Sequence, residues 1–161
     1  EMLRSLVGSE MCIRDRLNGV NVTGRLREER IGNMTSAISV YPAVRTKLLE
    51  LQRQIAATKS VIMDGRDIGT CVLPDAVCKI YLTASVTTRA KRRYDELVDK
   101  GIPADMEAIK KDIEERDYRD MHRDVAPLKQ ADDAVLIDSS DMDINQVTAA
   151  IIKAYRDAIK E

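Results

Sequence analysis

The stretch that decides the fold is "VCKIYLTASVTTRAKRRYDELVDKG", residues 77–101. It opens with a short apolar run that is typical of a buried strand. Ser85 follows that run and precedes a charged helical segment, and serine is a preferred cap because its hydroxyl accepts a backbone N–H of the first turn. Gly101 closes the segment, as glycine commonly does at a helix C-terminus. The stretch therefore predicts a strand followed directly by a capped helix.

Strands and helices continue to alternate through the rest of the chain. Residues 61–63 and 133–140 are predicted to be two further strands, and residues 17–26 a short hairpin containing Asn-Gly. Helices are predicted over residues 43–60, 104–127 and 144–159, the second of them stopping before Pro127. This order indicates βαβ units and a mainly parallel sheet, so the expected fold class is α/β. Ligands of such sheets bind beyond the carboxyl ends of the strands, here in the loops after Met63, Thr83 and Ile137.

The composition limits the classes of function. The 161 residues carry a net charge of −1, no Phe or Trp, three Cys and one His. No apolar run is long enough for a bilayer, and no aromatic platform exists for stacking bases, so membrane and nucleic-acid partners are not expected. One histidine without a CxxC motif does not make a zinc site, and no metal-binding residue is predicted. His122 is expected to be an exposed helix residue, and Cys71 and Cys78 to be small apolar fillers.

Three arginines are predicted to line one side of the 104–127 helix. Arg116, Arg119 and Arg123 are spaced i, i+3, i+7, which places them within a sector of roughly 60°, with Asp120 on the same side. Guanidinium groups gathered in this way suit phosphate oxygens and can stabilise charge during phosphoryl transfer. The alternative is a solvated face with i, i+4 pairs, namely Arg116–Asp120 and Glu115–Arg119.

The segment "DGRDIGT", residues 64–70, follows the predicted 61–63 strand. Asp64 is a candidate for holding a ribose hydroxyl or a metal-bound water, Arg66 for holding a phosphate, and Asp67 for accepting from an exocyclic amine. The alternative is a charged turn in which Arg66 pairs with Asp64 or Asp67. A phosphate-binding P-loop is not found: "GVNVTGRL", residues 19–26, has the glycine spacing but ends in Arg-Leu within a hairpin pattern.

Taken in order, "LNGVNVTGRLREERIGNMTSAISVYPAVR", "VIMDGRDIGTCVLPDAVCKIYLTAS", "RAKRRYDEL" and "IEERDYRDMHRDVAPLKQADDAVLIDSS" resemble a bacterial cytidylate kinase from Leu17 nearly to the C-terminus. That family is a nucleoside monophosphate kinase of the P-loop fold. The resemblance implies transfer of the γ-phosphoryl group of ATP, with Mg²⁺, to CMP or dCMP, giving CDP or dCDP. It also implies a cytoplasmic enzyme, which we expect to be a monomer.

The resemblance assigns roles to individual residues. Ser36, Arg45 and Asp67 match positions that read cytosine, with Arg123 near the base, and Asp120, Arg116 and Ser36 match positions around the sugar. Arg66 matches a contact to the CMP phosphate. The lid arginines Arg116, Arg119 and Arg123, together with Asp64, are the predicted catalytic group. Arg89, Arg92 and Arg93 lie where the lid of the family begins, on the ATP side.

The N-terminal part departs from the family pattern. The first strand and the P-loop are expected to be missing, and "LVGSEMCIRDR", the eleven residues Leu6–Arg16, back-translates in one frame into a transposase adapter used for sequencing libraries. We therefore expect residues 1–16 to be non-native, 17–45 to be a partial nucleotide-binding insert, and 46–161 to be the kinase core with a lid at about 88–127. The alternatives are a non-catalytic nucleotide- or anion-binding fragment, and a kinase for another pyrimidine monophosphate such as UMP.

Overall fold

The structure is a computed structural model that describes residues 16–17, 20–22, 25, 29–38 and 41–160. The chain forms two compact units, residues 1–68 and 69–161. Predicted divisions that fall on residues 1–15 lie outside the described part of the chain. The division by role, at residues 45 and 46, stays a prediction.

The first unit contains a hairpin and two helices. Strands β1 (Arg16–Leu17) and β2 (Val20–Asn21) pair antiparallel, with Arg16 opposite Asn21, which confirms the predicted hairpin. Helix α2 (Pro42–Thr58) confirms the helix predicted over 43–60, and its proline stands in the first turn, where no N–H is needed. Helix α1 (Glu29–Ile38) was not predicted.

The strand predicted at residues 61–63 is wrong. Residues 61–64 belong to no strand or helix, and Ile62 is 89% exposed. A strand exists only as part of a ladder, because its N–H and C=O groups need partners on a neighbouring strand. The described part of the chain holds two two-stranded sheets, and neither includes this segment. The apolar run therefore ends in an irregular stretch that leads to the 64–67 loop.

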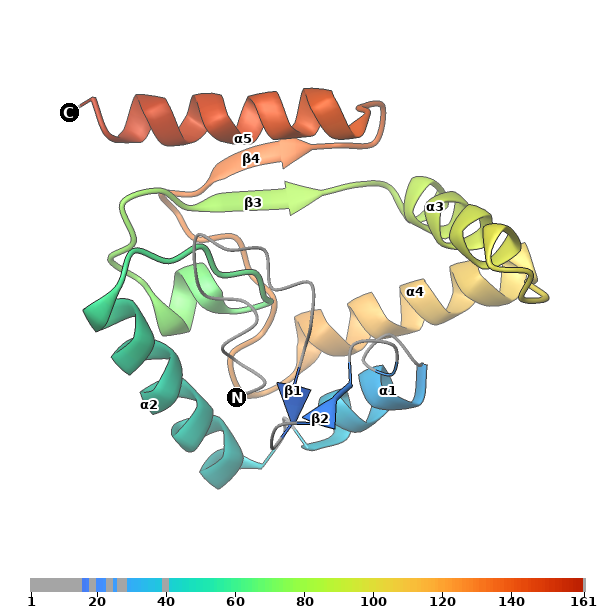
Figure 1. The fold of residues 1–161 in the computed structure, drawn as a ribbon, viewed down its shortest axis with the longest axis horizontal. Helices are drawn as coiled ribbons and strands as arrows, with labels where there is room; N and C mark the ends of the chain where they lie inside the picture. The colour runs from blue at the N-terminus through green and yellow to red at the C-terminus, as the bar shows by residue number, and fades with distance from the viewer. Residues whose placement is uncertain (1–15, 18–19, 23–24, 26–28, 39–40, 161) are drawn as a thin grey trace. The chain divides into compact units, whose positions relative to one another are not determined.

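The second unit contains the parallel sheet. Strands β3 (Ile80–Thr83) and β4 (Val135–Asp138) pair in parallel with Ile80 opposite Val135 and Thr83 opposite Asp138 (Figure 1). Both strands were predicted, and the α/β class with a parallel sheet and flanking helices is confirmed. Because the strands are parallel and in register, their carboxyl ends lie at the same edge. A π-helical turn, η2 (Ile68–Val72), begins at the end of the first unit and continues into the second.

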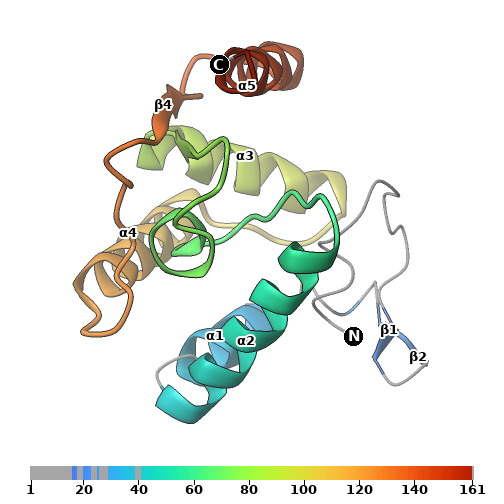
Figure 2. The ribbon, with the colours of Figure 1, turned by 90° about the vertical axis from the view of Figure 1, so that its left-hand side faces the viewer.

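Two long helices follow β3 and lie side by side (Figure 2). Helix α3 (Val86–Asp99) is capped by Ser85, whose Oγ accepts the Thr88 N–H at 3.1 Å, as predicted. Gly101 adopts φ +68 and lets the Ile102 N–H reach the Leu97 carbonyl at 2.9 Å, which closes the helix. Helix α4 (Met106–His122) is capped by Asp105, which accepts from the Ala108 N–H at 2.9 Å.

Helix α4 ends earlier than its sequence pattern suggests. Arg123 has an extended backbone (φ −70, ψ 142), so it leaves the helical row, and the prediction of three arginines on one continuous helical face is wrong at this residue. The Leu128 N–H folds back to the Asp120 carbonyl at 2.8 Å, and Ala126 adopts φ 49. Pro127 disfavours a helical conformation at the residue before it, so the chain turns before the proline.

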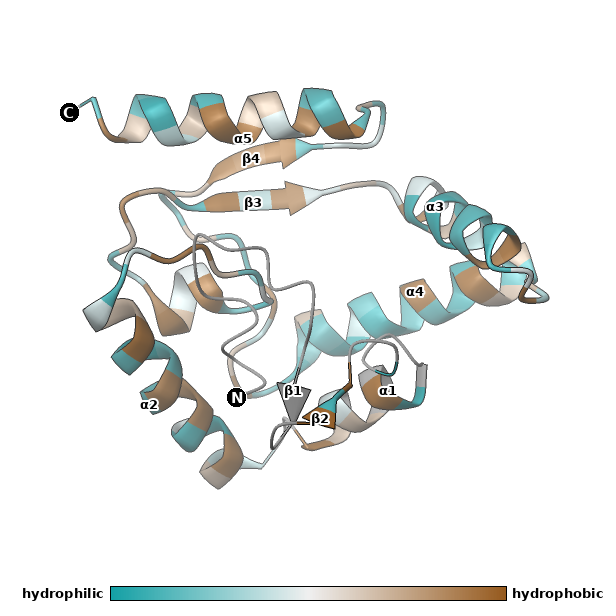
Figure 3. Ribbon diagram, viewed as in Figure 1, coloured by the Kyte–Doolittle hydropathy of each residue, from teal (hydrophilic) through white to brown (hydrophobic). Residues whose placement is uncertain are grey.

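The apolar core of the second unit is small. Among the described residues, the buried apolar side chains are Val72, Ala84, Ala90 and Ile137. Figure 3 shows apolar residues concentrated on β3 and β4, whereas α4 is mostly hydrophilic. Helix α5 (Ile144–Ala158), predicted at 144–159, begins with a capping box between Asp143 and Gln146 and packs beside β4. Every helix in the described ranges is too short or too polar to span a bilayer.

Candidate functional site

Two of the predicted cytosine-reading residues of the first unit form an ion pair. Arg45 of α2 donates through Nη2 to Oδ2 of Asp67 in the 64–67 loop, and the two side chains are only 21% and 17% exposed. The resemblance had placed both residues against the same base, and the structure brings them together across 22 residues of sequence. Asp67 therefore has Arg45 as an ion-pair partner, which neither alternative for a charged turn had included.

The unit holds three other predicted site residues. Asp64 and Arg66 are exposed. Gly65 permits the tight path of the loop, because a Cβ there would come within 2.8 Å of the Ile68 side chain. Ser36 belongs to α1, but its side chain lies outside the described part of the structure.

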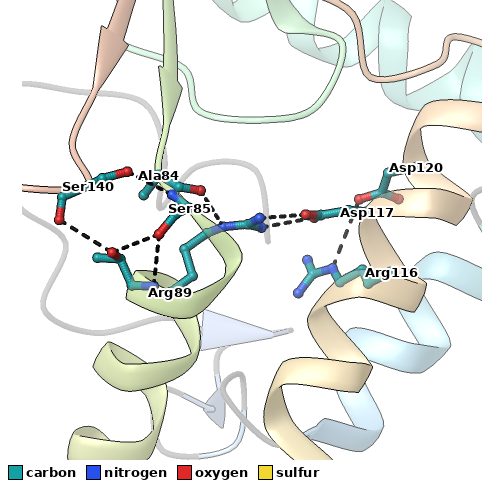
Figure 4. Close-up of polar contacts among 8 residues, drawn as sticks. Ala84, Ser85, Arg89, Arg116, Asp117, Asp120 and Ser140 are labelled. Carbon is teal, nitrogen blue, oxygen red and sulfur yellow. Dashed lines mark hydrogen bonds and ion pairs between the residues drawn. The ribbon is translucent and has the colours of Figure 1, made fainter. Parts of the chain in front are cut away.

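In the second unit, hydroxyl groups bridge the carboxyl ends of β3 and β4 (Figure 4). The Ser85 backbone N–H donates to Ser140 Oγ at 2.8 Å, and that hydroxyl donates to Asp138 Oδ1 at 2.6 Å. The hydrogen bond from the Ser140 hydroxyl, aided by the Ser140 backbone N–H, lowers the pKa of Asp138 below its usual value. The edge at which α/β sheets bind ligands is thus organised as a hydrogen-bonded network.

Arg89 extends this network to helix α4. Its Nε donates to the Ala84 carbonyl at 2.9 Å, and its two terminal nitrogens donate to the two oxygens of Asp117 at 3.0 and 2.6 Å. Figure 4 shows the guanidinium lying between the end of β3 and α4. A bidentate pair of this kind fixes orientation as well as distance.

The other two predicted ATP-side arginines also contact protein groups. Arg92 donates to the Ser139 carbonyl at 2.5 Å and the Met142 carbonyl at 3.3 Å, which ties α3 to the loop after β4. Arg93 pairs with Glu96 at 2.9 Å within α3. Their contact with ATP stays a prediction.

The three arginines predicted to form the lid differ in their contacts, and only some of these contacts match the solvated-face alternative. Arg116 is 56% exposed and pairs at 4.0 Å with Asp120, whose side chain is 12% exposed, as the solvated-face alternative predicted. Arg119 is exposed, and its Nε donates at 3.3 Å to the Glu115 backbone carbonyl rather than to the Glu115 carboxylate. Arg123 donates through Nε to the Ala126 carbonyl at 2.6 Å and supports the turn after the helix. Arg116 and Asp120 thus form an ion pair on α4, and the lid role of the three arginines stays a prediction.

The histidine and the cysteines were given no role in the sequence. His122 is exposed, donates through Nδ1 to the Tyr118 carbonyl at 2.8 Å and stacks on the Tyr118 ring with the ring centroids 4.1 Å apart. Cys71 and Cys78 are half-buried thiols, whereas Cys12 is outside the described residues. Within the described ranges, no group of three or more His, Cys, Asp or Glu side chains is arranged to hold a metal ion.

Two residues of the network were missed from the sequence, namely Asp117 and Ser140. Asp117 stands beside Arg116 in "RDYRD", and attention to the arginine row left it aside. Ser140 lies in the loop after Ile137, at the sheet edge where ligands were predicted to bind. That position could have identified it from the sequence.

Known proteins similar to this chain share one description. A family profile described as cytidylate kinase matches residues 5–157. The cytidylate kinase of Streptococcus sanguinis strain SK36 is 54% identical over 132 residues, covering 82% of this chain and 59% of the relative. That of Streptococcus gordonii strain Challis is 52% identical with the same coverage, and that of Streptococcus pneumoniae strain Hungary19A-6 is 47% identical over 148 residues, covering 92% of this chain and 65% of the relative.

The chain thus spans 59% to 65% of the length of these relatives. The matched range begins at residue 5 and includes Leu6–Arg16, so the adapter origin of that segment stays a prediction. Because the profile covers nearly the whole chain and the relatives are about half identical to it, the chain belongs to the cytidylate kinase family.

Proposed function

We propose that this chain is the nucleotide-selecting part of a kinase that transfers the γ-phosphoryl group of ATP to CMP or dCMP. Membership of the cytidylate kinase family supports the reaction class. The observation that carries the substrate is the Arg45–Asp67 pair, which presents a donor and an acceptor from two separate elements at one point. The activity belongs to the whole protein, because the chain spans 59% of the first relatives.

The chemistry of the pair suits cytosine. Cytosine offers an amino donor at N4, and Asp67 supplies a carboxylate acceptor for it. Uracil carries an acceptor oxygen at the same position, which would face the carboxylate with no hydrogen between the two oxygens. Sites that leave buried polar groups unpaired reject a ligand strongly. With Asp67 17% exposed, this penalty is only partly relieved by water.

The arginines supply the charge that phosphoryl transfer needs. Arg66 is assigned to the CMP phosphate, and the lid residues Arg116, Arg119 and Arg123 to the transferred group, where positive charge stabilises the developing negative charge. Asp120 and the Ser36 hydroxyl are assigned to the sugar. Arg89, Arg92 and Arg93 remain assigned to the ATP side.

Mg²⁺ fits this arrangement as a companion of ATP. It keeps several waters and binds mainly through substrate phosphates and one or two carboxylates. Asp64 is exposed, and its single carboxylate suits a metal-bound water. The residues of this chain thus orient the nucleotide, and Mg²⁺ supplies charge neutralisation to the phosphates when bound. We further propose a cytoplasmic monomer.

Calorimetric titration of the chain with CMP, dCMP and UMP tests the proposal. We expect CMP or dCMP to bind more tightly than UMP, and Asp67→Asn to reduce that preference. Glu50→Gln is the matched control, because Glu50 is 54% exposed in an ion pair on α2. Equal affinity for CMP and UMP would refute cytosine selection, and tighter UMP binding would favour the alternative uridylate kinase.

A coupled ADP-release assay tests turnover. We expect no measurable turnover from the 161 residues alone, because they contain no P-loop sequence. A version joined to the P-loop segment of a relative is expected to phosphorylate CMP. Binding without turnover in that version would favour the non-catalytic nucleotide-binding alternative.

A further inference from the structure

Arg89 connects three elements of the second unit through one guanidinium group. It originates in the first turn of α3, bonds the Ala84 carbonyl just after β3, and holds Asp117 of α4 through two parallel hydrogen bonds (Figure 4). The side chains of Arg89 and Asp117 are 35% and 20% exposed, so the pair is partly withdrawn from water. Neither the family resemblance nor the candidate site assigned a role to Asp117.

The position of Asp117 on α4 gives the pair a geometric consequence. Consecutive residues of an α-helix are rotated by about 100°, so Asp117 is turned by about 100° from Arg116 and by about 60° from Asp120. Rotation of α4 about its axis would separate the Asp117 oxygens from the Arg89 fork. The pair therefore fixes the direction in which the Arg116–Asp120 pair points.

Arg116 and Asp117 also differ in their partners. Asp117 is held by a group on another helix, whereas Arg116 is 56% exposed and pairs with Asp120 of its own helix, whose side chain is 12% exposed. The exposed Arg116 guanidinium can therefore meet a ligand, and Asp117 is anchored. A bidentate arginine–carboxylate contact is suited to anchoring because it constrains angle as well as distance.

We propose that Asp117, acting through Arg89, is a positioning residue that sets the rotation of α4 and so aims Arg116 and Asp120 at the sugar and phosphate of the nucleotide. The choice of ligand rests on the function proposed above. The anchoring itself does not, since it concerns contacts among α3, α4 and the end of β3.

Calorimetry with CMP is the first test, using Asp117→Asn, which keeps the shape of the side chain and removes its charge. We expect CMP affinity to fall about tenfold, the change that corresponds to about 1.4 kcal/mol. The direction of the change in CMP affinity distinguishes two explanations. Removal of a negative charge by itself favours binding of an anion, so electrostatics alone predicts tighter binding, whereas loss of the anchor predicts weaker binding. Asp117→Glu retains the carboxylate and is expected to recover part of the affinity.

Asp95→Asn is the matched control. It removes an exposed carboxylate from α3 that pairs with Lys91 of the same helix at 2.9 Å. CMP affinity is expected to be unchanged. If Asp117→Asn does not fold, Arg89→Lys carries the same test, because lysine keeps the charge but lacks the two-pronged fork.

Amide hydrogen exchange is the second test and needs no ligand. In Asp117→Asn we expect faster exchange along α4, with exchange along α5 unchanged. CMP affinity equal to or tighter than that of the unmodified chain would overturn the proposal. If the unmodified chain does not bind CMP, the proposed function fails, and exchange decides the anchoring: faster exchange confined to α4 supports it, and unchanged or uniformly faster exchange overturns it.

Discussion

Replacing either member of the Arg45–Asp67 pair should destabilise the first unit by more than a surface ion pair would. The side chains are 21% and 17% exposed, so removing one leaves the other charge mostly withdrawn from water and without its ion-pair partner. Exposed pairs contribute up to about 1 kcal/mol, and breaking a fully buried pair costs about 3–5 kcal/mol. For this intermediate exposure we expect Arg45→Met and Asp67→Asn each to cost about 1–2 kcal/mol.

The double variant separates pairing from the separate effects of the two substitutions. With both charges gone, no isolated charge remains, so the combined cost should be about 1–2 kcal/mol and not the sum of the single costs. The coupling energy between the two substitutions is then about 1–2 kcal/mol. Urea unfolding followed by circular dichroism measures the free energy of unfolding of each variant. The comparison requires that the slope of this free energy with urea concentration is the same in all variants.

Lys47→Met is the matched control for the arginine substitution. Lys47 is also on α2, but it is 68% exposed and pairs with an exposed Glu50 at 3.4 Å. Its loss should change the unfolding free energy by no more than about 0.5 kcal/mol. If the two single-variant costs sum to the cost of the double variant to within about 0.3 kcal/mol, the pairing is refuted. The main structural support for cytosine selection would then be lost.

Two further outcomes follow from the second unit. Ser85→Ala should lower the free energy of unfolding by about 1 kcal/mol, because the Thr88 N–H loses its 3.1 Å acceptor. The melting temperature should then fall by about 2–4 °C, and an unchanged melting temperature would contradict the capping role. Glu96 has its pKa lowered from 4.5 to about 2 by hydrogen bonds from Lys100 and then Arg93. A depressed carboxyl pKa stabilises the fold above the unfolded value, so the stability advantage over Glu96→Gln should be constant above pH 4.5 and disappear as the pH falls towards 2. Urea midpoints of the two proteins measured across that pH range check this expectation. A difference between the midpoints that does not depend on pH would contradict it.

The sequence was most informative where local chemistry alone determines structure. Ser85 and Gly101 mark the two ends of α3 because a hydroxyl cap and a left-handed glycine each satisfy backbone groups within a few residues. The two ends of α3 depend on such short-range rules, and both were confirmed. The alternation of strands and helices predicted a parallel sheet, which β3 and β4 form, but it did not predict which strands pair.

The misses involve partners that are distant in sequence. Residues 61–63 have the composition of a strand, but a ladder needs a neighbour that composition does not supply. Arg123 follows the helical spacing of α4, but the contact between Leu128 and Asp120 turns the chain before that residue can extend the helix. Asp117 appeared to be one more charge on a solvated face, and only its contact with Arg89 shows otherwise.

The turn after α4 also has a thermodynamic cost. Ala126 is the single described non-glycine residue with positive φ, and an L-residue pays roughly 1–2 kcal/mol for that geometry. Glycine would avoid this strain but would give the unfolded chain more freedom to lose on folding. The two effects on the free energy of unfolding oppose each other. The alanine reduces the conformational entropy of the unfolded chain, but it strains the backbone of the folded turn.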